Sequence, residues 1–152
     1  MLDLVIADSS CLIVLTKVDR LELLNQIFDR VLVPPEVAQE YGLTLPDWIT
    51  IESPTSNSIA ELSRFELDPG ERAAIALALD HPDATIVIDD LEARRISNRF
   101  GLRLTGTLGV LVVAKEMNVI PAILPIIKQI QSTNFHLSTA VIQDALRSAG
   151  EL

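Results

Sequence analysis

Short apolar runs recur along the chain, separated by segments with helical spacing. Four runs rich in Val, Ile and Leu are bounded by turn residues, as buried strands are. They predict core strands at Leu4–Ala7, Val31–Val33, Thr85–Ile88 and Leu102–Thr105. Trp48–Ile51 predicts a further short or edge strand. Because these runs are almost continuously apolar, they favour a parallel sheet covered on both faces.

Helical periodicity fills the segments between the strands. Leu12, Ile13, Leu15 and Val18 give an apolar face to a helix that follows the first strand. The segment Glu71–Leu79 is apolar almost all round, which indicates a buried helix. Further helices are predicted at Arg20–Phe28, Pro35–Tyr41, Ser58–Phe65, Leu91–Phe100, Leu108–Met117, Ala122–Gln131 and Ser138–Ser148.

Length and composition indicate one globular domain spanning residues 1–152. The chain is 49% hydrophobic and contains no linker long enough to divide it. The lone Cys11 cannot form an internal disulfide, and its apolar surroundings favour a buried structural thiol in a reducing compartment. Asp3 and Asp8 interrupt the first apolar run, so no signal peptide is expected, and no run is long enough to span a bilayer. We therefore expect a soluble, cytoplasmic protein.

The net charge of −9 argues against tight, non-specific binding to nucleic acid, because phosphate-binding proteins usually carry a basic face. A local site in which metal ions neutralise several carboxylates remains compatible with this charge. The composition therefore directs attention to clustered acidic residues.

Acidic residues follow two of the predicted core strands. Asp8 comes directly after the first strand, and the pair Asp89–Asp90 comes directly after the third. Right-handed crossovers place the carboxyl ends of parallel strands at one edge of the sheet, where ligands bind in α/β folds. Glu40, on the short helix after the second strand, and Glu71, at the start of the buried helix, could reach the same edge. Such oxygen ligands suit Mg²⁺ or Mn²⁺, and two such ions can promote phosphodiester hydrolysis.

Each acidic residue also has an ordinary structural interpretation. Asp8 and the pair Asp89–Asp90 could cap helices, and Glu71 could be a first-turn charge. A single glutamate such as Glu40 is most often solvated surface. The combination on one edge is more informative than any member of it.

Polar and basic residues near this edge could contact a substrate. Ser9 and Ser10 could hydrogen-bond near Asp8 or cap the following helix. Thr107 could touch a phosphate at a helix N-terminus or cap that helix. Arg94 begins a basic segment that could guide an RNA backbone, hold an acidic partner or form an exposed helix face.

The chain resembles the PIN-domain family, small metal-dependent ribonucleases that include many toxins of toxin–antitoxin pairs. Four motifs carry the resemblance: IADSSCLI at 6–13, VPPEVAQE at 33–40, GERAAIA at 70–76 and IVIDD at 86–90. Two further segments, Gly106–Gly109 and Ala145–Glu151, resemble a little-characterised prokaryotic branch. Glu71 stands where many members carry Asp.

The resemblance implies a fold, an activity and a set of site residues. The fold is a three-layer α/β/α domain around a mainly parallel sheet of about five strands. The activity is hydrolysis of RNA with Mg²⁺ or Mn²⁺, in a homodimeric toxin that binds a small antitoxin protein and no membrane. The implied catalytic residues are Asp8, Glu40, Glu71 and Asp90, and the implied metal ligands are Asp8, Glu71, Asp90 and, second to Asp90, Asp89. The substrate contacts expected beside them, from the residues themselves, are Ser9, Ser10, Thr107 and Arg94.

Two other functions compete with the ribonuclease. The same fold could be a catalytically weak module that binds RNA or protein. An aspartyl-phosphate protein is disfavoured, because a receiver would pair acids at the end of the first strand, where position 7 is Ala. A phosphatase would carry a second Asp at position 10, where Ser10 stands.

Overall fold

The computed structural model describes all 152 residues and contains a five-stranded parallel sheet. The strand order is β3-β2-β1-β4-β5, and every neighbouring pair is parallel. The strands are β1 (Leu2–Ala7), β2 (Phe28–Val33), β3 (Ile49–Ile51), β4 (Thr85–Val87) and β5 (Arg103–Thr105). The predicted parallel sheet of about five strands is confirmed, with Ile49–Ile51 as an edge strand.

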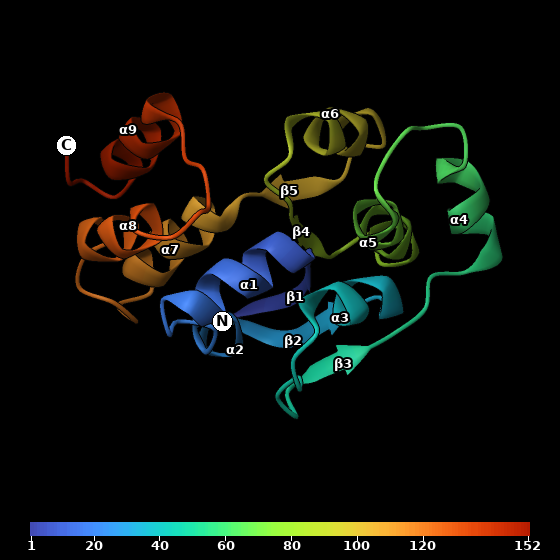
Figure 1. Ribbon diagram of the computed structural model, residues 1–152, viewed down its shortest axis with the longest axis horizontal. Coiled ribbons are helices and arrows are strands. Elements are labelled where there is room, and N and C mark those ends of the chain that lie inside the picture. The colour runs from blue at the N-terminus through green and yellow to red at the C-terminus, as the bar shows by residue number, and fades with distance from the viewer.

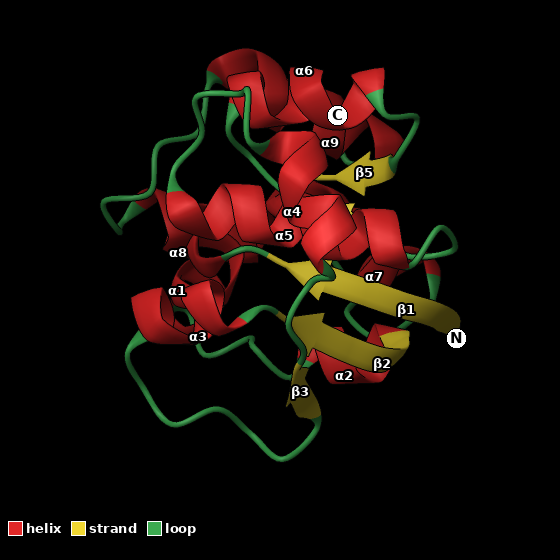
Figure 2. Cartoon of the chain, turned by 90° about the vertical axis from the view of Figure 1, so that its right-hand side faces the viewer, coloured by secondary structure: helices red, strands yellow, loops and turns green.

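The chain also forms nine helices, most of which lie around the sheet, while the last two lie to one side of it (Figure 1). They are α1 (Ser9–Lys17), α2 (Leu23–Ile27), α3 (Pro35–Tyr41), α4 (Ser56–Leu62), α5 (Pro69–Asp80), α6 (Leu91–Arg99), α7 (Thr107–Glu116), α8 (Leu124–Gln131) and α9 (Thr139–Ser148). Right-handed crossovers put α1, α2 and α3 on one face and α4, α5 and α6 on the other. The packing of α1 on α3, α4 on α5 and α5 on α6 agrees with this division. The result is the predicted three-layer α/β/α architecture (Figure 2).

The centre of the sheet is the most buried part of the molecule. Val5, Ile6 and Ala7 of β1 have no exposed surface, because β2 and β4 flank the strand and helices cover both faces. The buried helix predicted from its apolar residues is α5, which packs on β1 and β4. A single cluster of 43 buried residues joins the sheet and helices. This core holds the strands in place and thereby sets the positions of their carboxyl ends.

One predicted helix was wrong at both of its ends. The segment Arg20–Phe28 forms a helix only over Leu23–Ile27, and Phe28 already begins β2. Leu2 pairs with Phe28 and Leu4 pairs with Arg30, so strand pairing extends β2 to the amino side of the predicted Val31. The apolar spacing of this segment could not show that backbone pairing.

The remaining elements lie within a few residues of their predicted positions. α4 ends at Leu62 rather than Phe65, so Arg64 and Phe65 lie in the connection to α5. The C-terminal helices α7, α8 and α9 gather on the side of the molecule opposite α4 (Figure 1). No helix of this structure has the length and apolarity needed to cross a membrane.

Candidate active site

The carboxyl ends of β1, β4 and β5 lie side by side. Ala7 pairs with Val87, and Val87 pairs with Thr105. The pairing continues beyond the strands, because the Asp8 N–H donates to the Val87 carbonyl and the Ile88 N–H donates to the Thr105 carbonyl. The structure therefore brings Asp8, Asp89 and Thr107 to one edge, as the topology predicts.

Asp8 is the only buried carboxylate in the molecule, with 4% of its surface exposed. It is the N-cap of α1, and its Oδ1 accepts a hydrogen bond of 2.9 Å from the Cys11 N–H. Ser9 and Ser10 are the first residues of α1, so the interpretation of either as the cap was wrong. Capping uses one Asp8 oxygen, and no side chain of the protein donates to the other.

Asp89 is held by both of its oxygens. Oδ1 accepts from the Thr107 N–H at 2.9 Å, and Oδ2 accepts from the Thr107 hydroxyl at 2.6 Å. Thr107 is fully buried and is the first residue of α7, whose N-cap is Gly106, so Thr107 does not cap that helix. The pair joins the end of β4 to the start of α7 and fixes the position of the Asp89 carboxylate.

Asp90 has a different structural role from that of Asp89. It is exposed and caps α6, with Oδ2 accepting from the Ala93 N–H at 3.0 Å. Arg94 follows in the first turns of α6, and its Nη1 donates to the Ile88 carbonyl at 2.9 Å. Arg94 thus braces the end of β4 and forms no ion pair with either aspartate.

The amino end of α5 adds two acidic residues, of which the sequence interpretation named only Glu71. Asp68 is the N-cap of α5, and its Oδ1 accepts from the Glu71 N–H at 2.8 Å. The signal was available: Asp68 is followed by Pro69, a favoured first helical residue, and Glu71 stands three positions later.

Glu40 reaches this region across Gly70. A Cβ atom added at Gly70 would overlap the Glu40 carboxylate, so the close approach of α3 and α5 depends on glycine at this position. Glu40 is exposed, and Asp68 is the acidic residue whose charge raises the pKa of Glu40. The structure therefore places Glu40 at the rim, while Asp8 lies at the buried centre.

The acidic side chains raise one another's pKa values. Burial, the largest cause, and the charges of Asp89, Glu71 and Asp68 raise the pKa of Asp8 to about 8. Burial, Asp68 and Asp90 raise the pKa of Glu71 to about 7. Burial and Asp68 also raise the pKa of Glu40, and a hydrogen bond from Ser9 offsets part of that rise. Asp68 is the one residue that influences Asp8, Glu40 and Glu71.

A family model described as a PIN domain matches residues 4–151. The chain belongs to the PIN-domain family. No curated protein and no solved structure matches the chain. The membership identifies a nuclease-type fold, and the acidic edge lies at the strand ends where an α/β fold binds its ligands.

The donor set of this PIN domain fits a hard divalent cation in its chemistry. All the ligand candidates are carboxylates, the oxygen donors that Mg²⁺ and Mn²⁺ prefer, and no Lys or Arg side chain forms an ion pair with them. A cation would relieve the repulsion that raises their pKa values. No three or more of these side chains already surround a single point as metal ligands would.

Two neighbouring features complete the PIN-domain site. Cys11 is buried beneath Asp8, and burial together with the Asp8 and Asp89 charges raises the pKa of its thiol, so it is a structural residue as predicted. A cavity of about 450 Å³ touches the site at Asp89 and Arg94 and is otherwise lined mainly by α7, α9 and the connection that precedes α9. This cavity adjoins the acidic residues without covering Asp8.

Proposed function

We propose that the protein hydrolyses RNA phosphodiester bonds with the help of Mg²⁺ or Mn²⁺. One observation carries the proposal: a buried aspartate at the carboxyl edge of a PIN-domain sheet faces other carboxylates and has no cationic partner. An uncompensated buried carboxylate costs stability, and perturbed carboxylates of this kind gather at functional sites. Binding a divalent cation is the simplest use of such an arrangement.

Asp8, Glu71, Asp90 and Asp89 would hold the cation. When bound, it supplies positive charge at the scissile phosphate and lowers the pKa of a water molecule. Asp8 would contribute the buried anchor, and Thr107 would act mainly by fixing Asp89 through the hydrogen bonds described above. Glu40 would act from the rim, and Asp68 joins the proposed set because it influences all three of Asp8, Glu40 and Glu71.

The substrate-binding residues proposed from the sequence differ in solvent exposure and in the hydrogen-bonding groups that remain free. Ser10 is exposed and Ser9 is half-buried beside Glu40, so both could donate to an RNA phosphate next to the acidic edge. Arg94 donates through Nη1 to the Ile88 carbonyl and is partly exposed, so its remaining N–H groups could meet a phosphate. The Thr107 hydroxyl is already used by Asp89.

The biological setting we propose rests on the family. It is that of a toxin in a toxin–antitoxin pair, acting as a homodimer that a small antitoxin protein inhibits. We further propose that residues 1–152 form a single domain, supported by the single hydrophobic core that joins all three layers.

A second candidate function is a catalytically weak module that binds RNA or protein. The observation that favours it is that no three acidic side chains are already arranged around one point. This alternative predicts weak metal affinity and no metal-dependent turnover.

Cleavage of a labelled single-stranded RNA pool tests the proposal, with Mn²⁺, Mg²⁺ or EDTA. The wild type should cleave only with metal, and Asp8→Asn should lose at least about 100-fold in rate. Asn is also a good helix N-cap, so this substitution removes the charge while preserving the cap of α1. Asp90→Asn should lose activity as well, whereas Asp144→Asn, an equal charge change on α9, should leave cleavage unchanged.

Calorimetric titration with Mn²⁺ separates the two candidate functions. Binding that Asp8→Asn weakens, together with metal-dependent cleavage, supports the nuclease. A wild type that neither cleaves RNA nor binds Mn²⁺ would overturn the proposal and favour the binding module.

A further inference from the structure

Two arginines from distant parts of the sequence lie against one phenylalanine ring. The Arg64 guanidinium carbon is 4.8 Å from the centroid of the Phe65 ring, and that of Arg99 is 5.4 Å from it. Phe65 lies in the connection between α4 and α5, and Arg99 is the last residue of α6. Figure 1 shows this connection passing beside α6. We define Arg64, Phe65 and Arg99 as the arginine–phenylalanine cluster.

The ring is held in place from two further directions. Phe65 meets Phe100 edge to face, with centroids 5.9 Å apart and an interplanar angle of 76°. The Phe65 carbonyl accepts a hydrogen bond of 2.8 Å from Nη2 of Arg72. Since Arg72 directly follows Glu71, this bond ties the cluster to the helix that carries part of the acidic site.

The two arginines differ from the other arginines around them. Six arginines lie between positions 64 and 103. Four of them donate hydrogen bonds within the protein: Arg72 to Phe65, Arg94 to Ile88, Arg95 to Glu92 and Arg103 to Asp83. Arg64 and Arg99 donate none and form no ion pair, although the chain carries 21 acidic residues and Glu66 adjoins Phe65.

Holding two exposed, unpaired guanidinium groups on one ring costs repulsion that a bound anion would relieve. Guanidinium groups bind phosphate with several donors, and their exposed planes can stack on a nucleobase. Phe65 precedes Asp68 by three residues, so their Cα atoms are at most about 10 Å apart. The cluster therefore lies next to the amino end of α5, close enough for one nucleic-acid strand to contact both the cluster and the acidic edge.

We propose that the arginine–phenylalanine cluster binds the phosphate backbone of single-stranded RNA beside the acidic edge. This inference rests on the proposed ribonuclease function and names the part of the surface that holds its substrate. It also explains how a chain with a net charge of −9 retains a polyanion next to several carboxylates. The cations of the cluster supply the attraction, and they contact the backbone without reading base sequence.

Fluorescence anisotropy of labelled single-stranded RNA tests the cluster directly. All proteins carry Asp8→Asn, so that cleavage does not disturb binding, and the titrations are repeated over a series of salt concentrations with Mg²⁺. The double substitution Arg64→Gln/Arg99→Gln should weaken binding about tenfold for two unrelated RNA sequences. The slope of log affinity against log salt should decrease by about 1.4, as expected for two lost contacts with single-stranded phosphates.

A matched control removes the same charge elsewhere. Arg95→Gln/Arg147→Gln replaces two arginines that are already paired with Glu92 and Asp144, and it should leave affinity and salt slope unchanged. Thermal melting of each variant should show that the fold is retained. Arg64→Lys/Arg99→Lys keeps the charge but loses the planar groups, and it should bind RNA with intermediate affinity.

Three results would overturn the inference: unchanged affinity in the cluster variant, an equal loss in the control variant, or no RNA binding by the Asp8→Asn protein even at low salt. The proposed function is judged separately from the cleavage assay with the wild-type residue at position 8. RNA that is bound through the cluster but never cleaved would sustain the inference and refute the nuclease. Cleavage at full kcat and unchanged KM in the Gln variant would sustain the nuclease and refute the inference.

Discussion

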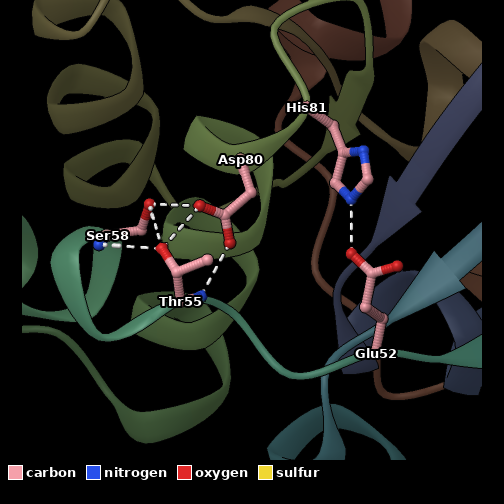
Figure 3. A network of polar contacts seen from close by, with 5 residues as sticks. All are labelled: Glu52, Thr55, Ser58, Asp80 and His81. Atoms are coloured by element: carbon pink, nitrogen blue, oxygen red, sulfur yellow. Dashed lines mark hydrogen bonds and ion pairs between the residues drawn. The ribbon is translucent and has the colours of Figure 1, made fainter.

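Two groups of acidic residues in this protein have opposite surroundings. Asp80, at the carboxyl end of α5, accepts hydrogen bonds from the Thr55 N–H at 2.7 Å, the Thr55 hydroxyl at 2.8 Å and the Ser58 hydroxyl at 2.5 Å (Figure 3). Asp8, directly after the carboxyl end of β1, accepts one backbone N–H and faces other carboxylates. The Asp80 carboxylate therefore accepts three hydrogen bonds, whereas the negative charge of Asp8 is left without a compensating partner.

The pKa values follow these surroundings. Burial raises the pKa of Asp80, but the hydrogen bonds from Ser58 and Thr55 outweigh that effect and lower it below its usual value. Burial and neighbouring charges raise the pKa of Asp8 to about 8. A hydrogen bond from the Ile123 N–H is the largest cause that lowers the pKa of Glu151, which also accepts from Leu124 and Lys115.

This difference separates structural acidic residues from candidate functional ones. Asp80 joins the start of α4 to the end of α5, and next to it Glu52 pairs with His81 across the same connection (Figure 3). Glu151 joins the C-terminal residues to the start of α8. At the acidic edge, the buried Asp8 has one backbone donor and no side-chain or cationic partner, and uncompensated charge of this kind is what a cation-binding site requires.

The largest expected effect comes from the charge of Asp8. Its pKa lies near 3.8 in the unfolded chain and about 8 in the folded protein, so folding takes up a proton between those values. Stability should therefore fall as the pH rises from about 4 to 8, and the raised pKa of Glu71 acts in the same direction. In EDTA at pH 8, Asp8→Asn should melt about 10 °C above the wild type.

Melting curves at pH 5 and pH 8, recorded by circular dichroism, check this prediction. The advantage of Asp8→Asn should shrink at pH 5, and Asp144→Asn should show no advantage at either pH. An Asp8→Asn protein less stable than the wild type at pH 8 would mean that the Asp8 charge is compensated after all.

A smaller effect of opposite sign is expected at Asp80. Asp80→Ala leaves three donors of Thr55 and Ser58 without their acceptor, one of them on the buried Ser58. The loss should be about 2 kcal/mol, which lowers the melting temperature by about 6 °C. Asp80→Asn retains an acceptor oxygen and should lose less, as chemical unfolding in urea can measure. Equal stability of Asp80→Ala and wild type would remove the contrast drawn between the two regions.

The smallest expected effect lies at the contact between Thr107 and Asp89. Thr107→Val keeps the shape and the backbone donor but removes the hydroxyl that Asp89 Oδ2 accepts. Stability should fall by about 1 kcal/mol, or about 3 °C, and RNA cleavage should fall several-fold because Asp89 is less well positioned. Thr107→Ser restores the hydroxyl and should recover the cleavage rate. A Val variant as active as the wild type would show that the position of Asp89 is unimportant for catalysis.

Much of the fold was predictable because it depends on local pattern. The core runs ending at Ala7 and Val33, and the run beginning at Thr85, are buried strands, and α5 is the buried helix that its apolar residues indicate. Parallel topology then brings Asp8 and Asp89 to one edge without knowledge of any contact. The beginning of β2 was not predictable, because Phe28 and Arg30 become strand only by pairing with β1.

Most residues of the candidate site could be predicted from the sequence, but the contacts that arrange them could be predicted less well. Residue types and positions indicated Asp8, Glu71, Asp89 and Asp90, whereas Asp68 was missed although an aspartate before proline is a recognisable helix start. Which carboxylate oxygens are already used depends on a contact between distant segments for Asp89 and on local helix capping for Asp90. Asp89 is bound by Thr107, eighteen residues away, and Asp90 caps its own helix.

The sequence by itself determined the alternation of strands and helices, the carboxyl edge and the acidic residues that follow its strands, because these depend on periodicity and chain direction. Only the tertiary structure decided how each charge is compensated. Asp8 is uncompensated and Asp80 is satisfied, and Arg64 meets Arg99 on one ring, because packing brings together segments that are far apart in the chain. Burial and partner geometry, which set the energy of a charge, exist only after that packing.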